Sequence, residues 1–204
     1  MLVLPKLYAI CDRSFFSRRA EFLDYVCQLN AAGCHLLQYR NKLGTAPDVL
    51  DEGIELRSRL DTSVTLILND RADLALAAGF NGVHLGQDDL SPDSARKMIG
   101  NERLLGFSTH NPRQVEEADK SSADYIAIGP VFATSSKANP DPVVGLDGVR
   151  QARGRTKKPL VAIGGITRSN CLSVIQAGAD CVAVISDLLL EPIKSAEEFR
   201  SMLG

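Results

Sequence analysis

The stretch Val64-Thr65-Leu66-Ile67-Leu68-Asn69-Asp70-Arg71 joins a short apolar run to an abrupt polar end. Gly82-Val83-His84-Leu85 repeats the pattern and is followed by Gly86-Gln87-Asp88-Asp89. Continuous apolar runs of this length are typical of strands that are buried on both faces of a parallel sheet. In both stretches, acidic residues therefore come where a buried strand ends.

Similar runs recur along the whole chain. We expect eight strands, at residues 7–11, 34–39, 64–68, 82–85, 104–107, 125–128, 160–163 and 181–185. The 204 residues divided over eight strands give about 25 residues per unit. This spacing fits a repeat of strand, loop, helix and loop.

The segments between the runs carry helix signals. Phe22, Leu23, Val26 and Leu29 share one face of a helix, as a 3.6-residue period requires. Ser91-Pro92 and Asn111-Pro112 each place a capping side chain before a proline at the first helical position. Ser195 and Glu198 have the spacing of a capping box for the last helix.

A weak internal repeat marks where three helices end. Ala31-Ala32-Gly33-Cys34, Ala77-Ala78-Gly79-Phe80 and Gln176-Ala177-Gly178-Ala179 each place a glycine just before an apolar run. We predict one (β/α)8 TIM barrel, a single α/β domain over residues 1–204. An open doubly wound sheet is the alternative, but eight evenly spaced units favour closure.

Composition excludes several classes of protein. The net charge of −2 and the pI near 5.9 argue against a nucleic-acid partner. The N-terminal residues lack the pattern of a signal peptide, and no apolar run approaches a membrane span. Five cysteines, without a Cys-x-x-Cys motif, favour buried reduced thiols in a cytoplasmic protein.

The two acidic stretches predict a magnesium site. Parallel strands end at one rim of a barrel, so Asp70 can face either Asp88 or Asp89 across a pocket there, because these two neighbours cannot both point inward. Mg²⁺ takes one or two carboxylates and fills its remaining positions with water and phosphate. The pair indicates an enzyme that handles a phosphorylated substrate. Asp70 as a helix N-cap and Asp89 as a turn residue are the simpler alternatives.

Basic and polar side chains follow the second strand. Alternation puts Gln38, Arg40 and Lys42 on one side of the chain. Two cations on one face can neutralise a diphosphate, with the arginine fork binding two oxygens. Taken alone, they favour a solvated strand end, but together with the acidic pair they favour a functional site.

Later loops add candidate phosphate ligands. Gly164-Gly165 and Ser186 follow the seventh and eighth strands, where these barrels usually bind phosphate. The long segment 130–145 contains Thr134 and the hydroxyls and lysine that follow it, and we predict that it forms a mobile lid. His84 and His110 show no triad pattern, so an acid–base role for them is the less favoured interpretation.

Taken together, the motifs closely resemble the thiamine phosphate synthase family. The matching pieces follow the family order over nearly the whole chain: Leu7-Tyr8-Ala9-Ile10, Gln38-x-Arg40-x-Lys42, Asn69-Asp70-Arg71, Gly82-Val83-His84-Leu85-Gly86-Gln87-x-Asp89, Gly106-x-Ser108-x-His110, Asp124-Tyr125-Ile126, Gly129-Pro130-Val131-Phe132, Thr134-x-Ser136-Lys137, Ala162-Ile163-Gly164-Gly165-Ile166 and Val184-Ile185-Ser186.

The resemblance implies a transferase that joins two thiamine precursors on a barrel. One precursor is 4-amino-2-methyl-5-hydroxymethylpyrimidine diphosphate, and the other is a thiazole phosphate or its carboxylated form. In the family, diphosphate leaves early and the thiazole nitrogen captures the resulting pyrimidine cation. The resemblance also suggests a homodimer.

The resemblance also implies a role for each matching position. Asp70 and Asp89 hold Mg²⁺, and Arg40, Lys42, Ser108 and Lys137 act in catalysis. The residues expected to bind the two substrates are Gln38, Tyr39, Arg40, Asn41, Lys42, Asn69, Ser108, Thr134, Ser135, Ser136, Lys137, Gly165, Ile185 and Ser186.

Three positions depart from the family pattern. Cys11 replaces a hydroxyl residue, Asn41 replaces the usual Glu, and Ser136 replaces a common Thr. A related thiazole tautomerase, or a noncatalytic sensor of phosphate ligands, shares the fold. Neither needs the acidic pair together with the basic strip, so the sequence favours the synthase.

Overall fold

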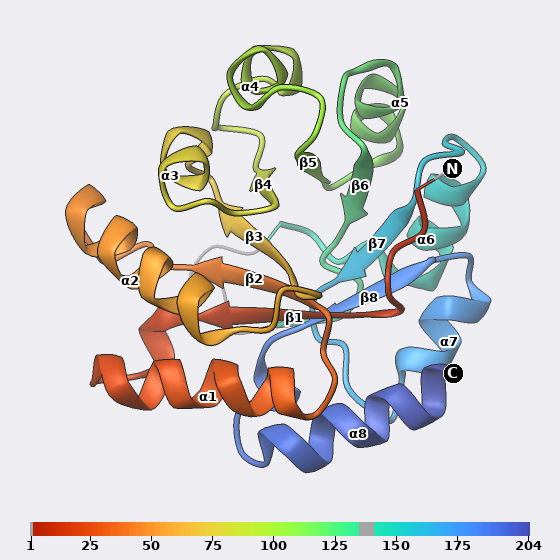
Figure 1. The fold of residues 1–204 in the computed structure, drawn as a ribbon. Helices are drawn as coiled ribbons and strands as arrows, with labels where there is room; N and C mark the ends of the chain where they lie inside the picture. The colour runs from red at the N-terminus through yellow and green to blue at the C-terminus, as the bar shows by residue number, and fades with distance from the viewer. Residues whose placement is uncertain (1, 135–140) are drawn as a thin grey trace.

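Eight parallel strands pair in chain order and close on themselves inside a ring of helices (Figure 1). The computed structural model describes residues 2–134 and 141–204. The strands are β1 (Leu7–Asp12), β2 (Leu36–Arg40), β3 (Thr65–Asn69), β4 (Gly82–Leu85), β5 (Leu104–Thr109), β6 (Tyr125–Ile128), β7 (Leu160–Ile163) and β8 (Cys181–Val184).

Helices follow the strands and cover the outside of the barrel. They are α1 (Arg19–Ala31), α2 (Ala46–Arg59), α3 (Ala72–Ala77), α4 (Pro92–Ile99), α5 (Pro112–Lys120), α6 (Gly145–Arg153), α7 (Cys171–Gln176) and α8 (Pro192–Leu203). Two 3₁₀ turns, η1 (Arg13–Phe15) and η2 (Ser186–Leu188), follow β1 and β8.

Pairing of the first strand with the last confirms the closed barrel. Leu7 lies opposite Val182 and Ala9 opposite Val184, in parallel register. The open doubly wound sheet is therefore excluded. The predicted second strand began too early, because the Cys34 amide donates to the Leu29 carbonyl (3.0 Å) and so belongs to the end of α1.

Two apolar layers hold the barrel together. One fills the space between strands and helices and includes Phe22, Leu23, Val26 and Leu29, which are all buried as the helical period predicted. The other fills the interior of the barrel with Leu4 and with alternate strand residues: Tyr8, Ile10, Leu36, Ile67, Tyr125, Ala127, Val161, Cys181 and Ala183.

Most of the predicted helix ends are confirmed. The Ser91 and Asn111 side chains accept the amides of Ser94 and Gln114 at the starts of α4 and α5. Gly33, Gly79 and Gly178 have positive φ at the ends of α1, α3 and α7.

One helix start was predicted wrongly. The capping box at Ser195 and Glu198 is wrong, because α8 already begins at Pro192. Glu198 instead pairs with the Arg168 guanidinium.

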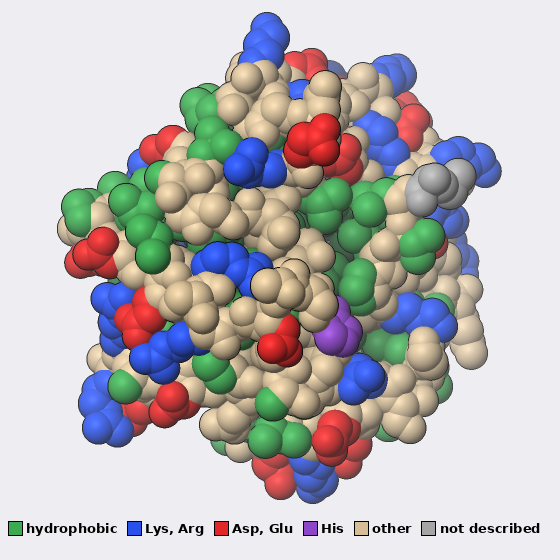
Figure 2. All heavy atoms as spheres, in the orientation of Figure 1, with side chains coloured by type: hydrophobic (Ala, Val, Ile, Leu, Met, Phe, Trp, Pro, Cys, Tyr) green, Lys and Arg blue, Asp and Glu red, His purple; other side chains and the backbone are tan. Residues whose placement is uncertain are grey.

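Most of the cysteine side chains are buried in the fold. All five cysteines are free, and Cys11, Cys34, Cys171 and Cys181 are buried. Within the described residues, no helix is long and apolar enough to cross a membrane. On the face shown in Figure 2, Lys and Arg side chains are interspersed with Asp and Glu.

Candidate active site

A cavity of about 450 Å³ opens where the strands end. Its wall draws on β1 and on the ends and following loops of the other seven strands, which is where catalytic groups lie in barrels of this kind. Eleven of the residues singled out from the sequence line this one cavity: Gln38, Arg40, Lys42, Asn69, Asp70, Asp89, Ser108, Thr134, Gly165, Ile185 and Ser186.

The other predicted residues are not placed in the cavity. Tyr39 points outward, and its hydroxyl donates to Glu52 Oε2 (2.5 Å) beneath α2. Asn41 Oδ1 accepts the amides of Leu43 and Gly44 (3.1 and 2.8 Å), which closes the loop after β2. Three more predicted residues, and the centre of the proposed lid, lie outside the described residues: Ser135, Ser136 and Lys137.

The carboxylates of Asp70 and Asp89 face one another at the rim. Asp70 has φ 66° and donates its amide to the His84 carbonyl (2.8 Å), which ties the end of β3 to β4. Asp89 Oδ2 accepts the Gly86 amide (2.7 Å) and so also closes a turn. The N-cap of α3 is Arg71, so Asp70 does not cap that helix.

The charge of this pair is only partly balanced. Burial raises the pKa of Asp89, and the neighbouring Asp70 carboxyl raises that pKa further. The Gly86 amide and the Lys42 ammonium act in the opposite direction. Lys42 Nζ lies 3.0 Å from Asp70 Oδ2.

This arrangement fits a divalent cation. A cation between the two carboxylates would remove the repulsion that raises the Asp89 pKa. Within residues 2–134 and 141–204, no group of three or more His, Cys, Asp or Glu side chains forms a closed metal site. Two carboxylates, with other positions left to water and substrate oxygens, match the coordination of Mg²⁺ rather than that of a structural zinc.

The Arg40 side chain is positioned by an acidic residue that was not predicted from the sequence. Its guanidinium pairs with Asp12, which is 1% exposed. Asp12 Oδ1 also accepts the Ser14 amide (3.0 Å) and the Ser14 hydroxyl (2.7 Å). Asp12 follows the first apolar run directly, the same signal that drew attention to Asp70.

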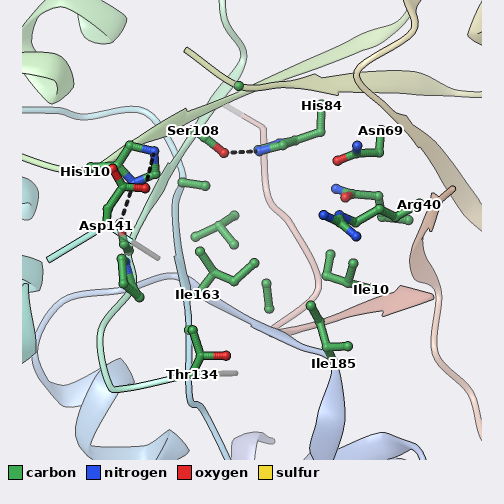
Figure 3. A pocket seen from close by; sticks show the side chains of 18 of the residues that line it. Ile10, Arg40, Asn69, His84, Ser108, His110, Thr134, Asp141, Ile163 and Ile185 are labelled. Carbon is green, nitrogen blue, oxygen red and sulfur yellow. Dashed lines mark hydrogen bonds and ion pairs between the residues drawn. The ribbon is translucent and has the colours of Figure 1, made fainter. Parts of the chain in front are cut away.

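His84 and His110 both line the cavity, and Ser108 lies between them (Figure 3). His84 Nε2 is 2.8 Å from the Ser108 hydroxyl, and burial lowers the pKa of His84 to about 4. His110 Nδ1 is 2.7 Å from the Gly129 carbonyl, and its Nε2 is 3.5 Å from Asp141 Oδ2. His84 is therefore neutral at neutral pH.

At the corner formed by the ends of β7 and β8, the backbone of the segment after β6 packs closely against Gly165. Gly165 has φ 61°, and a Cβ there would lie 2.5 Å from the Ala133 carbonyl oxygen. The segment after β6 crosses here, and the Val131 amide donates to the Ile163 carbonyl (2.9 Å). Glycine thus lets this segment pass over the end of β7, with Gly165 on the cavity wall.

Comparison with known proteins decides the family. The model of the family described as thiamine monophosphate synthase matches residues 7–188. This chain belongs to that family. A thiamine-phosphate synthase from Koribacter versatilis is 58% identical over 99% of this chain and 97% of the relative. One from Chloroflexus aurantiacus is 41% identical over 98% and 93%.

Solved structures of the thiamine monophosphate synthase family have the same fold. Thiamine phosphate pyrophosphorylase from Pyrococcus furiosus superposes with a TM-score of 0.86 at 31% identity. The match covers 97% of this chain and 95% of that one.

Proposed function

We propose that this protein is a thiamine phosphate synthase. It would join 4-amino-2-methyl-5-hydroxymethylpyrimidine diphosphate to a thiazole phosphate, or to its carboxylated form, and release thiamine phosphate and diphosphate, together with carbon dioxide when the carboxylated form reacts. One observation carries the proposal within this family: facing carboxylates, two cations and the β7–β8 corner all line a single cavity.

The pyrimidine diphosphate would occupy the side of the cavity formed by β2 to β5. Arg40 and Lys42 supply positive charge for the diphosphate, and Asp70 and Asp89 are placed to hold Mg²⁺. When bound, Mg²⁺ would neutralise charge that develops on the leaving diphosphate. Asn69 and Ser108 offer hydrogen bonds on the same side, and Lys137 remains a sequence-based prediction.

The thiazole phosphate would occupy the opposite side. Thr134, Gly165 and Ser186 offer hydroxyl and amide groups there, and Ile185 offers an apolar wall. Ser135 and Ser136 are assigned to the same phosphate from the sequence alone. A phosphate at the loops after β7 and β8 agrees with the usual chemistry of these barrels.

The residues in the cavity suit a dissociative reaction. Arg40 and Lys42 favour charge on the departing diphosphate, and the thiazole nitrogen then attacks the methylene carbon of the pyrimidine cation. Such a reaction needs no strong base, because the nitrogen already carries its lone pair. Holding the two substrates side by side removes the entropic cost of bringing them together, and this supplies the rest of the rate enhancement.

Omission of single components tests the reaction. The enzyme, both precursors and Mg²⁺ are mixed, and thiamine phosphate is measured. The proposal predicts product only when every component is present. Isomerisation of the thiazole phosphate alone would identify a tautomerase, and tight binding without product would identify a sensor.

The remaining assignments are also proposals. Small molecules are the expected partners, and the net charge supports the absence of a nucleic-acid partner. Free buried thiols support a cytoplasmic location. The family resemblance alone supports a homodimer, which analytical ultracentrifugation tests directly.

A further inference from the structure

A chain of hydrogen bonds crosses the floor of the cavity inside the barrel. Gln38 Nε2 donates to the Tyr8 hydroxyl (2.8 Å), which is 3.1 Å from the Tyr125 hydroxyl. Tyr125 Oη is 3.1 Å from His84 Nδ1, and His84 Nε2 is 2.8 Å from Ser108 Oγ. The five side chains come from β2, β1, β6, β4 and β5.

Both ends of the chain reach the cavity, and Tyr125 at its centre does not. Gln38 and Ser108 line the cavity, whereas Tyr125 is fully buried and is absent from the wall. Tyr8 borders the cavity but is only 1% exposed. His84 and Ser108 point toward one another in Figure 3.

The buried groups permit two arrangements of the hydroxyl hydrogens in which Tyr125 both donates and accepts within the chain. If Tyr8 and His84 Nδ1–H both donated to Tyr125, the buried Tyr125 hydrogen would have no acceptor. In one, Tyr8 donates to Tyr125, Tyr125 donates to His84 Nδ1, and His84 Nε2–H donates to Ser108. In the other, Ser108 donates to His84 Nε2, His84 Nδ1–H donates to Tyr125, and Tyr125 donates to Tyr8. Tyr8 already accepts from Gln38, so the second arrangement leaves the Tyr8 hydrogen without an acceptor.

Burial decides between the two arrangements. An unpaired hydrogen on Tyr8 would be buried away from water, which is costly. In the first arrangement, the unpaired hydrogen is that of Ser108, which is only partly buried and faces the cavity. Water or a ligand can accept it there.

We infer that Tyr8, Tyr125 and His84 are positioning residues that fix His84 as the Nε2–H tautomer and make Ser108 a hydrogen-bond donor into the cavity. This inference rests on the proposed function for its catalytic consequence: the Ser108 hydrogen is aimed at an oxygen of the departing diphosphate. Gln38 is left with its amide oxygen free to accept from the ligand.

Two further features agree with this assignment. His84 is 8% exposed, and its ring lies between two hydroxyls, with Nδ1 facing Tyr125 and Nε2 facing Ser108. Gly106 provides the space for the contact, because a Cβ there would lie 2.1 Å from Tyr125 Cζ and 2.3 Å from His84 Nδ1.

Nitrogen-15 NMR of histidine-labelled, substrate-free enzyme reads the tautomer directly. We expect His84 to carry its hydrogen on Nε2, and Tyr125→Phe to remove the preference by deleting the donor to Nδ1. Tyr25→Phe is the matched control, because the buried Tyr25 hydroxyl has no hydrogen-bond partner. A hydrogen on Nδ1 of wild-type His84 would overturn the inference.

Steady-state kinetics then tests the consequence for catalysis. For Tyr125→Phe we expect kcat to fall about five- to tenfold, the factor for one net hydrogen bond, with little change in KM for the pyrimidine diphosphate. His84→Gln keeps an N–H donor and should retain more activity than His84→Leu. A kcat for Tyr125→Phe equal to that of Tyr25→Phe would overturn the inference that the Ser108 hydrogen bond contributes to catalysis.

The two proposals fail in distinguishable ways. A wild-type enzyme that forms no thiamine phosphate would refute the proposed function. The tautomer of His84 is measured without substrate, so it is decided independently of that activity.

Discussion

Replacing Asp12 with asparagine tests how the cavity holds Arg40. Asp12 is buried, receives two hydrogen bonds from Ser14 and pairs with the Arg40 guanidinium. All of these groups donate to Asp12. An asparagine has one oxygen and one NH₂ group, so at least one of its neighbours must face another donor.

The expected cost follows from these contacts. Loss of one charge-assisted hydrogen bond costs about 1.5–3 kcal/mol. Breaking a fully buried ion pair costs about 3–5 kcal/mol. The Arg40 side chain is 21% exposed and can turn toward water in the cavity. We therefore expect the free energy of unfolding to fall by about 2 kcal/mol, which lies in the range for one charge-assisted hydrogen bond and below that for a fully buried ion pair.

Urea unfolding measures this change, with Asp147→Asn as the control. Asp147 forms an exposed pair with Arg150, so its replacement should cost less than about 1 kcal/mol. Isothermal titration with diphosphate should show about tenfold weaker binding to Asp12→Asn, because Arg40 loses its orientation. Equal stability and equal diphosphate affinity in Asp12→Asn and wild type would refute the reasoning.

Three further substitutions address the metal, the barrel floor and the long loop. Asp89→Ala should lower turnover about 100-fold or more, because a cation ligand is lost, with little change in urea unfolding; unchanged magnesium-dependent activity would refute the metal role. Gly106→Ala should lower the free energy of unfolding in urea by about 1–3 kcal/mol, because the added Cβ would overlap Tyr125 and His84. Wild-type stability would show that these side chains can move aside and would contradict the prediction. Lys137→Ala should slow diphosphate departure in single-turnover kinetics, and a wild-type rate would remove Lys137 from the site.

The fold was largely predictable because parallel strands have a simple sequence pattern. A strand buried on both faces reads as a continuous apolar run, and β4, β6 and β7 have the predicted bounds. The ends of other elements depend on local hydrogen bonds that no pattern shows. Cys34 is apolar enough for a strand, yet its amide closes α1.

The site was predictable where strand geometry alone places side chains. Alternation put Gln38, Arg40 and Lys42 on one face, and all three line the cavity. The same alternation turns Tyr39 away, and its hydroxyl meets Glu52.

Contacts between residues that are far apart in the chain could not be predicted from the sequence. Tyr8 and Tyr125 are 117 residues apart and meet only because the barrel closes. Asp12 likewise acquires its role only when β1 lies beside β2 and Arg40 comes opposite it.

Titration of Mn²⁺ as a substitute for Mg²⁺, in the presence of diphosphate, tests the shared metal site most directly. Calorimetry on wild type should show one ion per chain, and Asp70→Asn and Asp89→Asn should each weaken its binding at least about tenfold. Asp73→Asn, which removes the same charge from an exposed pair with Arg71, should bind the ion like wild type. Wild-type affinity in either Asp70→Asn or Asp89→Asn would contradict the account.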